Sequence, residues 1–235
     1  MIPDRDTAIG GPHDHFPETQ VSLLEAASAG GQVTAEALDR ISLLYWKPVY
    51  KFVRLKFRKG NEEAKDLTQS FFASAIERGF FARFDPARAS FRTYLRMAVE
   101  RFAANDYAAA NRQKRGGGVE FEPVDEQAAA TESPEEIFDR EWRRQLFGLA
   151  LDDLRAHSEQ TGKQAQWAIF EAYDLADGER PSYAALAARH GVPETQVTNY
   201  LAWARRTLRG FVTSRLRGVT AGDRELREEM RRAWS

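Results

Sequence analysis

The 235-residue sequence contains no cysteine. This absence excludes disulfide bonds, thiolate metal sites and cysteine nucleophiles, and it is typical of a reducing compartment. The sequence also lacks any run of about 18 or more apolar residues that could span a membrane, and its first residues lack the apolar core of a secretory signal. We therefore expect a cytoplasmic protein that has no membrane partner.

Signals for catalysis and cofactor binding are missing as well. The glycines at 116–118 follow a predicted helix and precede an acidic stretch, which is not the context of a phosphate-binding loop. His13 and His15 lie in a Gly- and Pro-rich leader without further ligands nearby, and His157 and His190 are isolated at predicted helix ends. The sequence predicts that the protein is not an enzyme, binds no cofactor and holds no metal.

The hydrophobic pattern predicts an all-α protein, because apolar residues recur at helical spacing and no segment alternates with period two. We predict a flexible leader over 1–31, a helical domain over 32–115, an acidic linker over 116–136, a second helical domain over 137–217, and a tail over 218–235 with a short amphipathic helix. Pro48 is expected to kink or break the first helix. The expected buried side of the next helix comprises Ala64, Leu67, Phe71, Phe72 and Ile76.

Charge is segregated along the chain although the formal net charge is only −1. Arginine and lysine dominate residues 92–115 and 189–217, whereas residues 119–139 contain acids and no base. Basic side chains neutralise the phosphates of nucleic acids. Two basic segments on either side of an acidic tether therefore indicate two separate contacts with nucleic acid.

The first basic segment is a predicted helix over 90–112. Phe91, Leu95, Ala98 and Phe102 follow helical spacing and are expected to face the bundle. A neighbouring face mixes cations, amides and aromatic rings, which suits single-stranded or opening DNA. The candidate DNA-contacting residues are Arg92, Arg96, Arg101, Asn105, Arg112, Lys114 and Arg115. The alternative interpretation is a solvated basic face over an ordinary core.

The second basic segment predicts a helix-turn-helix. Ser182 is a suitable helix N-cap, Gly191 suits the turn between two helices, and Pro193 can open the second helix. The predicted buried stripe of that helix is Val197, Leu201, Ala204 and Leu208. The opposite face can reach base edges and phosphates in a major groove, and its candidates are Thr195, Gln196, Thr198, Asn199, Arg205 and Arg206.

The helix NEEAKDLTQSFFASAIERG, the turn FDPARAS, the basic helix and the helix-turn-helix occur in an order that resembles bacterial sigma factors of the extracytoplasmic-function (ECF) type. The resemblance covers about residues 34–217. It implies a region 2-like domain that docks on core RNA polymerase and melts the minus-ten element of promoter DNA, and a region 4-like domain that reads the minus-thirty-five element. The implied docking residues are Glu62, Glu63, Asp66 and Gln69. Tyr94 stands where the family usually has tryptophan, so the promoter sequence cannot be carried over.

The docking helix also departs from the family pattern, because Lys65 and Ser70 replace two usual carboxylates. A phosphate on Thr68 or Ser70 would restore negative charge. The resemblance to ECF groups that a Ser/Thr protein kinase controls implies such a kinase as the partner that adds the phosphate. An anti-sigma protein is a further partner that the resemblance leaves open. Three alternatives also stay open: Glu62, Glu63 and Asp66 suffice without phosphate, the chain is a stand-alone helix-turn-helix regulator, or it is a kinase-substrate adaptor without promoter activity.

Overall fold

The computed structural model describes residues 35–113 and 132–235, and within these ranges the chain forms helices and no strand. The all-α prediction is confirmed. The elements in order are α2 (Ala35–Lys56), α3 (Asn61–Glu77), η2 (Phe81–Arg83), α4 (Phe91–Gln113), α5 (Pro134–Gln160), α6 (Gln164–Phe170), the π-helical turn η4 (Glu171–Leu175), α7 (Tyr183–His190), α8 (Glu194–Arg217) and α9 (Asp223–Ala233). Among the helices of the described ranges, none combines the length and apolar character needed to span a membrane.

Helices α2, α3 and α4 form a bundle around an aromatic core. Phe71 of α3 makes edge-to-face contacts with Phe72, Phe80 and Phe102, at centroid distances between 5.4 and 6.0 Å. Helix α2 continues through Pro48, so the break expected there does not occur. Ala75 lies in the core, whereas Ile76 is 48% exposed, and the prediction that Ile76 is buried was wrong.

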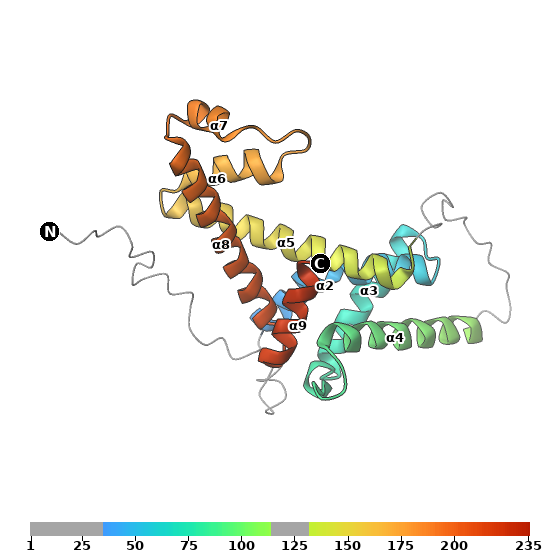
Figure 1. The fold of residues 1–235 in the computed structure, drawn as a ribbon. Helices are drawn as coiled ribbons and strands as arrows, with labels where there is room; N and C mark the ends of the chain where they lie inside the picture. Colours follow the sequence, from blue (N-terminus) through green and yellow to red (C-terminus); the bar gives the residue numbers. More distant parts are fainter. Residues whose placement is uncertain (1–34, 114–131) are drawn as a thin grey trace.

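The long helix α5 joins the two parts of the molecule (Figure 1). Its first half packs on α2, where Phe138 meets Phe52 edge-on at 5.8 Å and Trp142 is fully buried. Its second half packs on α6 and α8, and there Asp153 accepts two hydrogen bonds from Arg215 at 2.7 and 2.8 Å. One helix therefore supplies core side chains to both helical groups.

Helix α5 begins earlier than the sequence predicted. Ser133 caps it by accepting a hydrogen bond from the Glu136 amide at 3.2 Å, while the Glu136 carboxylate accepts from the Ser133 amide at 2.7 Å. The last residues of the predicted linker are consequently helical. The rest of that linker, up to residue 131, and the predicted leader lie outside the described residues.

Helix α9 folds back onto the bundle, as Figure 1 shows, and confirms the short helix expected in the tail. Leu226 and Ala233 are buried, and the Trp234 ring meets Phe147 of α5 at 4.9 Å. The Glu225 carboxylate accepts a hydrogen bond from the amide of Phe91, the first residue of α4, at 2.7 Å. An acid at a helix N-terminus satisfies a free amide and the helix dipole, so α9 fixes one end of α4.

Candidate nucleic-acid interface

Helices α7 and α8 follow one another through a short turn and pack against each other, in the segment where the sequence predicts a helix-turn-helix. Ser182 accepts a hydrogen bond from the Ala185 amide at 3.1 Å and so caps α7. Gly191 follows α7 with a φ of +64°, a left-handed conformation that favours glycine. The predicted N-cap, turn residue and buried stripe of α8 are confirmed, since Val197, Leu201, Ala204 and Leu208 are all buried.

The opposite face of α8 is open to solvent. Thr195, Gln196, Thr198 and Asn199 are exposed, so their polar groups are available to a groove of duplex DNA. Arg206 is exposed, whereas Arg205 donates two hydrogen bonds to the Asp174 carboxylate of η4, at 2.8 and 2.9 Å. The hydrogen bonds to Asp174 raise the pKa of Arg205, and the Asp174 carboxylate balances the positive charge of the guanidinium. The two adjacent arginines therefore differ in what they can offer a phosphate.

On α4 the predicted DNA-contacting face is divided. Arg101 and Asn105 are exposed, and Arg96 is half-buried. Tyr94 stacks on Phe80 at 4.5 Å and donates a hydrogen bond to the Phe80 carbonyl, so its ring packs at the edge of the core. The predictions for Arg112, Lys114 and Arg115 concern side chains outside those that the structure describes.

Arg92 does not lie on an exposed face, contrary to the expectation from helical spacing. Its side chain is only 9% exposed and donates a hydrogen bond to Asp139 of α5 at 2.9 Å. Its guanidinium also lies 3.4 Å from Glu229 of α9 and 4.4 Å from the Trp142 ring centroid. A buried cation held by two carboxylates and an aromatic ring is a structural element of this junction. In this arrangement Arg92 cannot contact DNA.

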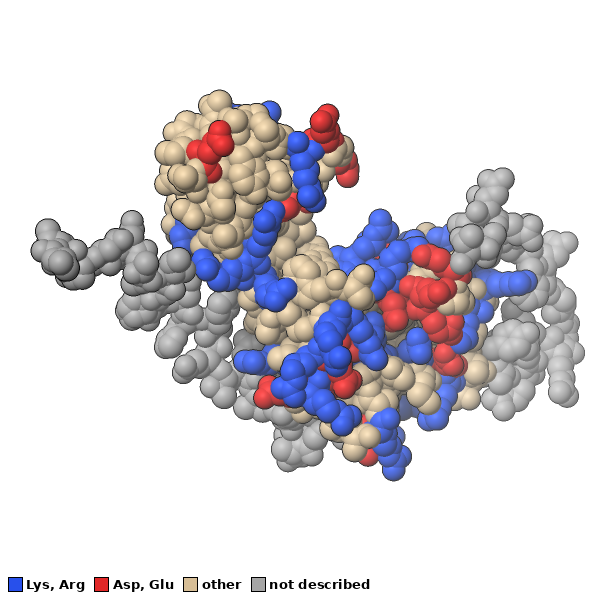
Figure 2. Space-filling view, in the orientation of Figure 1, with Lys and Arg blue, Asp and Glu red and all other residues tan. Residues whose placement is uncertain are grey.

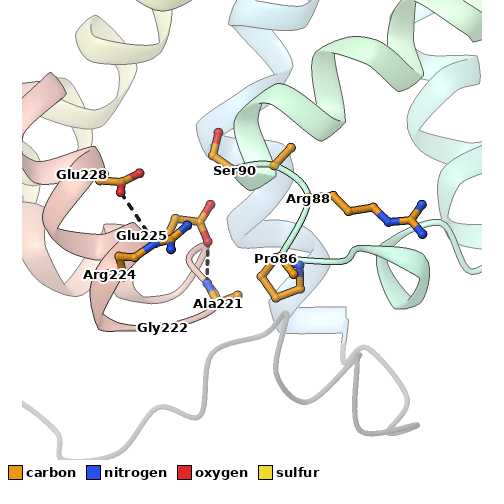
Figure 3. A pocket seen from close by; sticks show the side chains of 10 residues that line it. Pro86, Arg88, Ser90, Ala221, Gly222, Arg224, Glu225 and Glu228 are labelled. Atoms are coloured by element: carbon orange, nitrogen blue, oxygen red, sulfur yellow. Dashed lines mark hydrogen bonds and ion pairs between the residues drawn. The ribbon is translucent and has the colours of Figure 1, made fainter.

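Helices α2, α4, α5 and α9 meet around Arg92, in what we call the α9 junction: Tyr45, Phe91, Arg92, Asp139, Trp142, Glu225 and Glu229. Burial raises the pKa of Tyr45 and of Glu229, and for Glu229 the cations Arg92 and Arg232 oppose that shift. A hollow of about 530 Å³ lies beside the junction, between the 86–90 turn and residues 221–228. Figure 3 shows Glu225 bonded to the Ala221 amide at this hollow, with Arg224 paired to Glu228.

Helix α3 carries the predicted docking residues on its surface. Glu62, Glu63, Asp66 and Gln69 are all exposed, and Lys65 pairs with Glu62 at 2.8 Å. The two candidate phosphate acceptors differ sharply. Thr68 is fully buried and its hydroxyl donates to the Ala64 carbonyl at 2.7 Å, whereas Ser70 is exposed. A kinase can reach Ser70 in the folded chain but not Thr68.

The sequence patterns did not predict that Arg143 of α5 and Arg232 of α9 lie beside Arg92 and Arg96. The spacing of Asp139 and Arg143 could have indicated that these two residues share one face of α5, because residues four apart lie on the same side of a helix. The described residues contain no group of three or more His, Cys, Asp or Glu side chains that could hold a metal ion.

Comparison of the chain with models of protein families, with curated proteins and with solved structures finds no match.

Proposed function

We propose that this chain is an ECF-type sigma factor that binds core RNA polymerase through α3 and directs it to promoter DNA through α4 and α8. It performs no covalent chemistry of its own. The observation that carries the proposal is the coexistence of two differently charged, solvent-facing helical surfaces in one chain. One is the polar front of α8 in a helix-turn-helix, and the other is the acidic start of α3.

The front of α8 supports a role in reading duplex DNA. Its four exposed polar residues can donate to or accept from base edges, while Arg206 supplies a cation for a phosphate. The buried stripe behind them fixes the orientation of the helix, so the reading groups are held on one side. In the proposed promoter complex this face contacts the minus-thirty-five element.

On α4, the exposed Arg101 and Asn105 support contacts with the minus-ten element. Arg92 is not among these contacts, because its charge is already matched by Asp139 and Glu229. Arg96 is neither fully exposed like Arg101 nor buried like Arg92, because it is half-buried next to the α9 junction. The part of α4 that we propose to contact single-stranded DNA therefore excludes Arg92, the first arginine of the helix.

The acidic first turn of α3 supports docking on a basic partner surface, because charges of opposite sign steer association. Phosphate on Ser70 would add about −1.5 to −2 charges to the same helix at pH 7. The burial of Thr68 and the exposure of Ser70 support Ser70 as the acceptor. We therefore assign the kinase-controlled step, within this proposal, to Ser70 alone.

Binding to purified core RNA polymerase tests the proposal. We expect Ser70→Asp to bind more tightly than the unmodified chain, and Asp66→Ala to bind more weakly. The matched control is Ser214→Asp, which places the same charge on an exposed serine of α8, away from α3. Equal binding by Ser70→Asp and Ser214→Asp would remove the role of Ser70.

The stand-alone regulator is the main competing function, and a second binding assay separates the two. A sigma factor requires core polymerase for tight promoter binding, whereas a repressor or activator binds its operator unaided. Tight, sequence-specific binding of duplex DNA by the free chain, together with no binding of core polymerase in any form, would replace our proposal with that function.

A further inference from the structure

Helices α4, α5 and α9 enclose a polar pocket of about 390 Å³ next to the α9 junction. Its lining includes Arg92, Thr93, Arg96, Asp139, Arg143 and Arg232. Figure 2 shows lysine and arginine side chains crowded on the face where the end of α9 meets α5. Because the four arginines come from three helices that are distant in sequence, the fold gathers them at one place.

The charges in this pocket, which we call the arginine pocket, are only partly matched. Arg92 is held by Asp139 at 2.9 Å, and Arg232 donates to Glu229 at 3.0 Å. Within the part of the chain that the structure describes, Arg96 and Arg143 form no ion pair. Arg96 acts at longer range on Glu135, whose carboxylate is already bound by Lys56 at 2.8 Å. Two cations therefore remain available to a ligand.

Both of these arginines are half-buried, so they have lost part of their hydration without gaining a carboxylate. An anion that enters the pocket compensates the two arginines for their lost hydration. Each planar guanidinium group can donate two parallel hydrogen bonds to phosphate oxygens. Thr93 lines the same wall, and its hydroxyl is hydrogen-bonded to the Ser90 hydroxyl at 3.0 Å, so the arginines are the main groups offered to a ligand. No residue that lines the pocket is aromatic, so a nucleobase would find no stacking surface there.

We propose that the arginine pocket binds a small anion with at least two phosphate groups, such as the phosphates of a nucleoside di- or triphosphate. Recognition is of the phosphates and not of the base. The inference goes beyond the proposed sigma-factor function and does not rest on it, because Arg143 and Arg232 belong to neither the α8 face nor the docking helix.

Occupation of the pocket has a structural consequence. A ligand that contacts α4, α5 and α9 together favours the arrangement in which they are packed, so it raises the free energy of unfolding by an amount that grows with the logarithm of its concentration relative to Kd. It also engages Arg96, which is then unavailable to DNA.

Isothermal titration of the full chain with inorganic pyrophosphate, at fixed ionic strength and without divalent metal, tests the inference. The decisive variant is Arg143→Gln, and its matched control is Arg144→Gln on the same helix. Arg144 loses the same charge, but its side chain is 70% exposed, pairs with Glu141 at 3.3 Å and does not line the pocket. We expect Arg143→Gln to weaken pyrophosphate binding about tenfold or more, as for the loss of a charge-assisted hydrogen bond, and Arg144→Gln to leave it unchanged.

Thermal unfolding gives an independent reading of the same variants. Pyrophosphate and ATP, at one fixed concentration, should raise the midpoint of the unmodified chain and of Arg144→Gln equally, and that of Arg143→Gln by clearly less. Equal responses of the two variants would overturn the proposal, because they would reduce the effect to general surface charge. Absence of pyrophosphate binding combined with an Arg143-dependent affinity for a single-stranded oligonucleotide would also overturn it, in favour of a nucleic-acid backbone as the occupant.

Discussion

Helices α4 and α8 carry similar mixtures of arginine and amide side chains, yet the structure uses them differently. On α8 the polar face is exposed and the opposite, apolar face is buried, so the polar side chains are accessible to a ligand. On α4 the first arginine is closed into the α9 junction, and among the described residues predicted to contact DNA only Arg101 and Asn105 are exposed. A basic helical face is therefore available to nucleic acid only where no later segment of the chain covers it.

The largest expected effect comes from Arg92. Its replacement in Arg92→Ala leaves Glu229, which is 3% exposed, without one of its cations, and it removes the contact with Trp142. Breaking a buried ion pair by removing one partner costs about 3–5 kcal/mol of unfolding free energy. Urea denaturation measures this cost, and Arg101→Ala on the exposed part of α4 is the control, with an expected change within about 0.5 kcal/mol. Similar stabilities for the two variants would contradict the contrast between the two parts of α4.

This contrast marks the limit of what local sequence patterns can predict. The Ser182 cap of α7, the Gly191 turn and the buried stripe of α8 follow from residues within a few turns of one another, and they are confirmed. The burial of Arg92 depends on Asp139 and Glu229, which belong to helices far along the chain. No periodicity within α4 contains that information.

A similar limit explains the smaller misses. Helical spacing placed Ile76 on the buried side of α3, but the neighbouring bundle covers Ala75 instead. The spacing of apolar residues predicts which side of a helix is buried, but the packing of the neighbouring helices determines which residues at the border of that side are covered. Thr68, a candidate phosphate acceptor from its residue type, is buried, and the hydrogen bond from its hydroxyl to the Ala64 carbonyl offsets the cost of burying a polar group. The function of the candidate sites stays a prediction for the same reason, since it depends on partners outside the chain.

The next effect tests the turn that positions α8. Gly191→Ala forces a side chain into the left-handed region at φ +64° and should lower the stability by about 1 kcal/mol or more. Gly148→Ala is the matched control, because Gly148 lies inside α5 with open space where its Cβ would be. That control should raise the stability by about 0.5–1 kcal/mol, because alanine is the better helix former. Thermal unfolding of both variants checks the opposite signs, and equal signs would mean that the turn geometry is not as described.

A smaller effect compares the adjacent arginines of α8. If Arg206 contacts a DNA phosphate, Arg206→Ala should reduce the slope of log affinity against log salt by about 1. Arg205→Ala should change the slope less, because Asp174 already neutralises Arg205. Titration of duplex DNA at several salt concentrations gives both slopes. A larger change for Arg205 than for Arg206 would place the DNA on the other side of α8.

The smallest effect concerns pH and the α9 junction. Burial raises the pKa of Glu229, with Arg92 and Arg232 opposing the shift and Glu225 adding to it. A raised folded-state pKa in an acid means that the folded chain holds the proton more tightly, so its stabilising contribution is present below about pH 4.5 and is lost as the pH rises through the folded-state value. The stability of Glu229→Gln relative to the unmodified chain should therefore increase as the pH rises above 4.5. Denaturation curves at several pH values check this, and a constant difference would show that Glu229 keeps its ordinary pKa.

Transcription is the most direct test of the central claim that the chain directs core RNA polymerase to promoters. The chain, as Ser70→Asp, would be added to core polymerase and fragments of the genome that encodes it, and the 5′ ends of the transcripts would be sequenced. Our account predicts transcripts that start at defined positions, depend on the added chain, and are strongly reduced when Asn199→Ala and Arg206→Ala are combined. No chain-dependent transcripts in any phosphorylation state, from protein that is folded and binds DNA, would contradict it.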